Sequence, residues 1–147
     1  MKKIKLPELK IKVKATKGDE FYIKNSDDVV QVLRSIFNAD TIQWTEEFIL
    51  VCLNRAHKVI GYYKVGAGGF SVVVCDVKVI MTMALQSSAS SLIVAHNHPS
   101  GNLKPSEADR KMTDKINGAC KLLDMTLIDH IILTADGSYS FAEEGQL

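Results

Sequence analysis

Apolar and polar residues alternate along the chain with two different periods, which together predict a mixture of strands and helices. Apolar residues recur at helical spacing in three segments, residues 26–37, 76–86 and 106–123. Continuous or alternating apolar runs predict strands over residues 46–53, 58–65, 70–74, 92–95, 126–133 and 138–141. Strands and helices in this mixed order are typical of an α/β fold with a mixed central β-sheet and helices on both faces.

A lysine-rich arm, residues 1–25, precedes a single domain at residues 26–147. In the arm, the segment from Lys10 to Lys14 alternates, so that lysines share one face while Ile11 and Val13 share the other. Outward lysines protect the open edge of a sheet, and we therefore expect an edge strand here. A nucleic-acid-binding arm is the alternative, although the arm lacks the interleaved aromatic residues and arginines that would support it.

A pair of histidines follows one of the buried strands. The apolar residues 92–95 lead into His96, Asn97 and His98. Pro99 comes next and cannot donate to a strand ladder, so pairing should stop there. Successive side chains on a strand point to opposite faces, which places His96 and His98 on one face and Asn97 on the other. In a helix the two imidazoles would lie roughly 200° apart around the axis. The pattern therefore predicts two imidazoles side by side at a strand end.

Asp109 is the candidate third ligand for a metal ion at this strand end. It heads the apolar series Asp109, Met112, Ile116 and Cys120 of the next predicted helix, so its carboxylate points toward the core and needs a partner there. Two histidines and one aspartate on zinc leave the fourth tetrahedral position for water, as in catalytic sites. The alternative is structural, because Ser106-x-x-Asp109 is also a helix-capping sequence and an isolated His-x-His is often just two polar residues at a strand end.

The spacing His96-x-His98-x(7)-Ser106-x-x-Asp109 resembles the signature of the JAMM (MPN-domain) zinc metalloproteases. The longer string at residues 96–101, together with residues 127–132 downstream, is similar to the RadC-like branch of that family. The likeness runs from about Glu46 to the C-terminus. It implies the cytidine-deaminase-like JAMM architecture, although a deaminase itself is disfavoured because the Pro-Cys-x-x-Cys ligand pair is missing.

The resemblance implies a zinc-dependent metallopeptidase or isopeptidase with roles for two further residues. One zinc ion (Zn2+) in the His–His–Asp site, with water as its fourth ligand, would lower the pKa of that water toward about 7. The family places its general base where this chain has Glu46, and strand alternation sends the neighbouring Glu47 to the opposite face. Ser106 would cap its helix and, as the resemblance implies, direct its hydroxyl at the developing oxyanion.

The remaining histidines and the cysteines predict no further site. His57 falls in a turn between two strands and is excluded as a ligand, whereas His130 lies mid-strand among isoleucines and is expected to be a hydrogen-bonded core residue. Cys52, Cys75 and Cys120 lie within apolar patterns and form no Cys-x-x-Cys pair. Unpaired core thiols are consistent with a reducing cytoplasm.

Charge and hydropathy narrow the choice of partners. The formal net charge of +1 gives no global attraction to nucleic acid or to an anionic membrane. No apolar run approaches the roughly 20 residues of a membrane span, so we expect a cytoplasmic protein acting on an unidentified protein or peptide. Two alternatives stay open: a non-catalytic MPN-type interaction module, and a DNA-repair-associated accessory protein. Longer RadC proteins carry an N-terminal helix-hairpin-helix region, which has no counterpart in this sequence.

Overall fold

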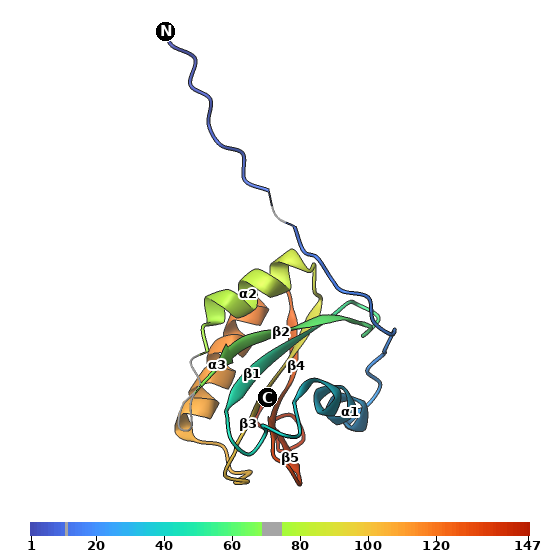
Figure 1. Ribbon diagram of the computed structural model, residues 1–147. Coiled ribbons are helices and arrows are strands. Elements are labelled where there is room, and N and C mark those ends of the chain that lie inside the picture. The colour runs from blue at the N-terminus through green and yellow to red at the C-terminus, as the bar shows by residue number, and fades with distance from the viewer. Residues whose placement is uncertain (11, 69–74) are drawn as a thin grey trace.

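A five-stranded sheet forms the centre of the computed structural model, which describes residues 1–10, 12–68 and 75–147 (Figure 1). The strands are β1 (Glu47–Leu53), β2 (Val59–Ala67), β3 (Ser91–Asn97), β4 (Thr126–Leu133) and β5 (Ser138–Ser140), and the helices are α1 (Ser26–Ile36), α2 (Val77–Gln86) and α3 (Glu107–Leu122). The strand order is β2-β1-β3-β4-β5, with β3 and β4 parallel and every other pair antiparallel. The mixed sheet predicted from the sequence is confirmed.

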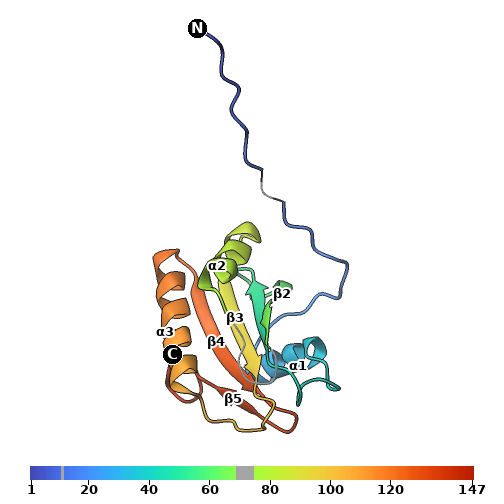
Figure 2. The same cartoon turned by 60° about the vertical axis from the view of Figure 1, so that its left-hand side comes forward.

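Helices cover both faces of the sheet, and alternate strand residues serve different layers. Leu33 of α1 packs in one buried cluster with Ile49 of β1. The next residue, Leu50, points to the opposite face and belongs to the other cluster, which includes Ile80 of α2 and Ile116 of α3. Figure 2 shows α1 on one side of the sheet and α2 and α3 on the other. A side chain on β1 or β3 therefore reaches one layer or the other according to its position in the strand.

Side chains at the helix starts satisfy backbone groups and set the boundaries. Asp76 and Ser106 cap α2 and α3, as the sequence predicts. α1 begins at Ser26, as predicted, and its cap is the preceding residue, Asn25. The backbone N–H of Asp28 donates to Asn25 Oδ1 at 2.9 Å, as part of a reciprocal capping box.

The strands follow the predicted segments closely, and β3 shows the largest extension, from the predicted residues 92–95 to Ser91–Asn97. β2 continues past the predicted end at residue 65, because Ala67 still pairs with Glu47 of β1. The predicted strand over residues 70–74 lies outside the described residues. None of the three helices in the described part of the chain has the length and hydrophobicity that a lipid bilayer crossing requires.

The prediction of an edge strand in the basic arm is wrong. Residues 10 and 12–14, where an edge strand is expected, belong to no strand, and Ile11 lies outside the described residues. The start of the arm extends away from the sheet (Figure 1), and residues 1–10 and 12–20 are exposed, so the alternating pattern has no neighbouring strand to pair with. On the outer edge of β2, the bridge that the structure describes joins Tyr22 to Lys58, just before the strand begins.

Candidate metal centre

Residues from the starts of β1 and α3 and the end of β3 meet at a cavity of about 320 Å³. Antiparallel pairing places Phe48 of β1 opposite His96 of β3, so the segment before β1 and the segment after β3 lie at the same edge of the sheet. The N-terminus of α3 closes the third side. The residues lining the cavity are Glu46, Phe48, Cys75, His96, His98, Ser106, Ala108, Asp109, Met112 and His130.

Two imidazoles and a carboxylate converge in this cavity. The Nε2 atoms of His96 and His98 lie 3.0 Å apart. Asp109 Oδ1 lies 3.1 Å from His96 Nε2, and Asp109 Oδ2 lies 3.3 Å from His98 Nε2. Ligands at 2.0–2.1 Å from a tetrahedral zinc ion are separated by about 3.3 Å, so these spacings fit three ligands around one ion. The structure therefore brings together the three residues that the sequence predicts as ligands.

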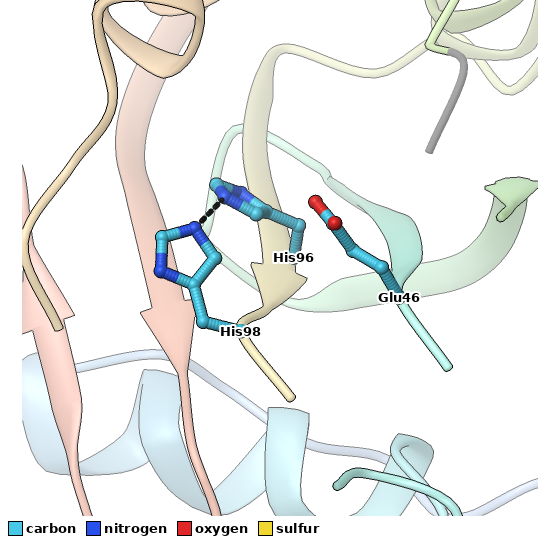
Figure 3. A group of neighbouring side chains, drawn as sticks. All are labelled: Glu46, His96 and His98. Atoms are coloured by element: carbon cyan, nitrogen blue, oxygen red, sulfur yellow. Dashed lines mark hydrogen bonds between the residues drawn. The ribbon is translucent and has the colours of Figure 1, made fainter. Parts of the chain in front are cut away.

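Glu46 faces the same cavity from the start of β1. Its position has the same phase as Phe48 and Leu50, which point toward α2 and α3. One ligand atom each of Glu46, His96 and His98 lies within 4.8 Å of the others, and these three residues could hold a metal ion (Figure 3). Asp109 makes shorter contacts with the two histidines than Glu46 does, so Asp109 is the better candidate for a third ligand and Glu46 would lie beside a bound ion.

Glu47 lies apart from this group, as strand alternation predicts. Its Oε1 accepts a hydrogen bond from Lys64 Nζ at 2.9 Å. Lys64 pairs with Ile49, which belongs to the layer on the α1 side of the sheet. The two neighbouring carboxylates are therefore divided between the two faces, and only Glu46 reaches the histidines.

The charges in the cavity depend on one another. Partial burial raises the pKa of Glu46, against the attraction of His96 and His98. Burial also opposes ionisation of Asp109, but hydrogen bonds from the two histidines outweigh it and hold the pKa of Asp109 well below its usual range. The hydrogen bond to Asp109 raises the pKa of His98, against its burial. Two ring nitrogens and a carboxylate in mutual contact need a positive charge between them, which a proton or a metal ion can supply.

Ser106 is confirmed as a helix cap and also lines the cavity. Its Oγ accepts the Asp109 backbone N–H at 3.1 Å, while its own backbone N–H donates to Asp109 Oδ2 at 2.8 Å. This capping box fixes the orientation of the Asp109 carboxylate as well as the start of α3. The two readings of Ser106-x-x-Asp109, a cap and a ligand-bearing motif, are therefore compatible in one structure.

Residues 23–146 match the family model of the RadC-like JAB domain. The chain belongs to the RadC-like JAB domain family. It is 42% identical over 100 residues to a UPF0758 protein of Flavobacterium johnsoniae, and the aligned region covers 68% of this chain and 44% of that relative. It is 44% identical over 103 residues to a UPF0758 protein of Porphyromonas gingivalis, and here the aligned region covers 69% of this chain and 45% of that relative. The matched region is thus less than half the length of either protein.

His130 of this JAB domain contributes more than the sequence predicts. It is a buried, hydrogen-bonded core residue as expected, but its partner is the candidate ligand His96, at 2.8 Å between His130 Nε2 and His96 Nδ1. Its other nitrogen, Nδ1, lies 2.6 Å from Thr113 Oγ1. Burial, assisted by repulsion from His96, lowers the pKa of His130 well below its ordinary value. One feature of the sequence points to this role: Thr113 lies one helical turn after Asp109 and therefore on the same face of the helix.

Asn97 positions the segment that carries Glu46, from the opposite face of β3. Its Nδ2 donates to the carbonyl oxygens of Ile42 and Thr45, at 2.8 and 2.7 Å. Its Oδ1 accepts the backbone N–H of Glu47 at 2.7 Å. A residue between the two ligand histidines thus fixes the chain on either side of Glu46, a role that strand alternation alone did not reveal.

Other candidate groups stay outside the chemistry of the cavity. His57 lies in the exposed turn between β1 and β2, as predicted, with a positive φ of 59°. Cys75 lines the cavity, but burial, with a smaller contribution from Asp76, raises the pKa of its thiol to about 12. A thiol with that pKa is a poor nucleophile at neutral pH. The cavity therefore favours metal chemistry over cysteine chemistry.

Proposed function

We propose that this JAB domain is a zinc-dependent hydrolase of peptide-type amides, a metallopeptidase or isopeptidase. The observation that carries the proposal is the convergence of two imidazole nitrogens and one carboxylate within 3.0–3.3 Å, with a second carboxylate beside them in a cavity. This arrangement is typical of catalytic zinc sites, in which three protein ligands leave one coordination position open.

In this proposal His96, His98 and Asp109 hold the ion. When bound there, zinc would act as a Lewis acid that makes the attacking water more acidic and polarises the substrate carbonyl. The ring of His98 is already held for this task, because its Nδ1–H donates to the backbone carbonyl of Asn102 at 2.6 Å and leaves Nε2 facing the cavity.

Glu46 acts as the general base. Its carboxylate accepts a proton from the attacking water and returns that proton to the amine that leaves when the amide bond breaks. The raised pKa of Glu46 makes its carboxylate a stronger base toward the attacking water. A pKa nearer the operating pH suits a group that both accepts and returns a proton. Glu46 also lies close enough to the histidines for the water to stand between them.

Ser106 contributes to binding the reacting carbonyl. Its Oγ lines the cavity and already accepts one backbone hydrogen bond, which leaves its own proton available to a substrate oxygen. A hydroxyl in this position would stabilise negative charge as it develops on that oxygen.

A peptide-library cleavage screen tests the proposed activity. Metal-stripped protein should be inactive, and added zinc should restore cleavage. The Glu46→Gln variant should remain inactive after zinc is restored, because glutamine cannot carry the proton. If zinc-loaded protein cleaves no member of a broad library, the alternative of a non-catalytic MPN-type interaction module replaces the hydrolase.

Nucleic acid is the second candidate partner, and the basic arm is the feature that favours it. Lysines recur along residues 2–17, and the described residues of this segment are exposed. Lysines on an extended chain can neutralise phosphates, with an affinity that falls steeply with salt. This partner would connect the domain to a DNA-repair-associated role without requiring the metal centre.

A cytoplasmic location fits the cysteines. Cys52 and Cys120 are buried, Cys75 is partly buried, and all three are free thiols. Free thiols persist in reducing compartments, and we therefore place the domain in the cytoplasm.

A further inference from the structure

A chain of three contacts, two of them buried and the third partly buried, joins His96 to the backbone of Asp109. His96 Nδ1 lies 2.8 Å from His130 Nε2, and His130 Nδ1 lies 2.6 Å from Thr113 Oγ1. Thr113 Oγ1 in turn donates to the carbonyl oxygen of Asp109 at 2.7 Å. The contacts run from β3 through β4 to α3, and they connect two of the three candidate ligands behind the cavity.

The direction of every hydrogen bond in this chain follows from its last member. A carbonyl oxygen only accepts, so the proton of Thr113 Oγ1 must point at Asp109. Thr113 Oγ1 then accepts from His130, which places a proton on Nδ1 of that ring. His130 is fully buried and its two hydrogen-bond partners, Thr113 and His96, carry no negative charge, so the ring keeps a lone pair on Nε2 rather than a second proton. His130 Nε2 can therefore only accept, and Nδ1 of His96 must carry a proton.

This order of protons determines how His96 faces the cavity. A neutral imidazole with its proton on Nδ1 has its lone pair on Nε2. His96 Nε2 is the atom beside His98 and Asp109. A metal ion binds the unprotonated nitrogen, so this tautomer is the one that can act as a ligand.

We propose that Thr113 and His130 are positioning residues that hold His96 in its metal-binding tautomer. The inference rests on the proposed function, since it assigns these residues to a metal site. Metal-ligating histidines commonly donate their second N–H to a carboxylate or a carbonyl. Here the acceptor is a second imidazole, whose own tautomer a threonine sets.

Aromatic packing keeps the two rings in place. Phe48 stacks on His96 with 5.8 Å between ring centroids and 3° between planes. Phe141 stacks on His130 at 4.7 Å and 9°. His96, His130 and Thr113 are all buried, so water has little access to compete for the hydrogen bonds that fix the tautomers.

The test compares two substitutions at Thr113. Thr113→Val keeps the shape but removes the acceptor for His130 Nδ1–H, which allows His130 to reverse its tautomer and drive a proton onto His96 Nε2. Zinc affinity, measured by chelator competition, should fall about 10–100-fold, the range for losing an outer hydrogen-bond partner of a ligand. Thr113→Ser retains the hydroxyl and should stay within about threefold of the unaltered protein.

His130→Phe provides a second variant, because it keeps a ring against Phe141 while removing the acceptor for His96. Its zinc affinity should fall at least as far as that of Thr113→Val, with circular dichroism confirming that each variant is folded. Unchanged zinc affinity in both Thr113→Val and His130→Phe would overturn the proposal. So would an equal loss in Thr113→Ser, since that would assign the effect to packing.

Nitrogen-15 NMR of the metal-free protein examines the tautomers without using zinc. Long-range correlations to the ring protons should show His130 protonated on Nδ1 and unprotonated on Nε2. A proton on His130 Nε2 would refute the proposed order. If the unaltered protein binds no zinc, the proposed function fails, while the NMR result still decides whether the proton order exists.

Discussion

At the scale of single residues, identical side chains take different roles because their neighbours differ. Glu46 and Glu47 are adjacent, but one lies beside two imidazoles and the other pairs with Lys64. The two ligand histidines also differ, since His98 donates to a backbone carbonyl and His96 contacts another imidazole. The chemistry of each group is therefore set by the groups that contact it, and for the two histidines by the hydrogen bond on the far side of the ring.

The two glutamates provide a matched pair of variants. Glu46→Gln should lower turnover of a cleavable peptide by about 10²–10⁴-fold, because a positioned base typically contributes that much, while zinc stays bound. Glu47→Gln removes an ion pair on the other face and should change turnover little. Steady-state kinetics with parallel metal analysis measures both. Inactivity of Glu47→Gln with activity of Glu46→Gln would mean that the carboxylates are assigned the wrong way round.

Zinc affinity should depend on pH through His98. Its pKa is raised above the ordinary value by the hydrogen bond to Asp109, so a proton competes with the metal at neutral as well as acidic pH. The affinity should therefore rise as pH increases through and above about 6.5, the ordinary pKa of histidine. Chelator competition at several pH values measures it. An affinity that stays constant from about pH 5.5 to 7.5 would show that no histidine in this range has to lose a proton.

At the scale of elements, the predictable part of the fold is the part encoded by local pattern. Apolar periodicity and capping residues were sufficient to predict α2, α3 and β4, and to place His96 and His98 at a strand end. The prediction of an edge strand near Lys12 was wrong, because an alternating pattern shows that a segment can pair but not that a partner strand is available. The contacts of His130 and Asn97 were not predicted, since they depend on which strand and which loop become neighbours.

The start of α3 offers a test that separates capping from substrate binding. Ser106→Ala should lower the free energy of unfolding by about 1 kcal/mol, whereas Ser106→Gly should cost only a few tenths, because glycine is a tolerated N-cap. If the hydroxyl also binds the substrate oxygen, both variants should lose turnover to a similar extent. Urea unfolding and peptide kinetics provide the two measurements. Turnover that tracks stability, with Ser106→Gly nearly normal, would reduce Ser106 to a cap.

At the scale of the whole molecule, the basic arm and the folded body are separate in structure. Ile23 is the first residue of the described chain to be buried in the core, and the family match also begins at residue 23. The candidate metal centre lies at the edge of the sheet where β1 begins and β3 ends, whereas the arm leaves the body near Lys58 at the start of β2 (Figure 1). Functions of the arm and of the metal centre should therefore be separable.

Deletion of residues 1–17 tests this separation. Metal content and peptide turnover should stay within a few-fold of the intact protein, because these residues precede the buried core. Binding to DNA or RNA, measured at several salt concentrations, should reveal any contribution of the arm. If the intact protein binds nucleic acid with a steep salt dependence and the deletion abolishes that binding, the nucleic-acid function gains support over the peptidase.

The most direct measurement of the central claim is the zinc content of purified protein by elemental analysis. A site with three well-placed ligands predicts about one zinc per chain. His98→Ala and Asp109→Ala should each lower that content sharply, while Glu47→Gln, which alters a carboxylate on the other face, should not. The variants should remain folded, because the buried core does not depend on the metal. Full retention of zinc in both His98→Ala and Asp109→Ala would contradict the claim that these residues hold the ion.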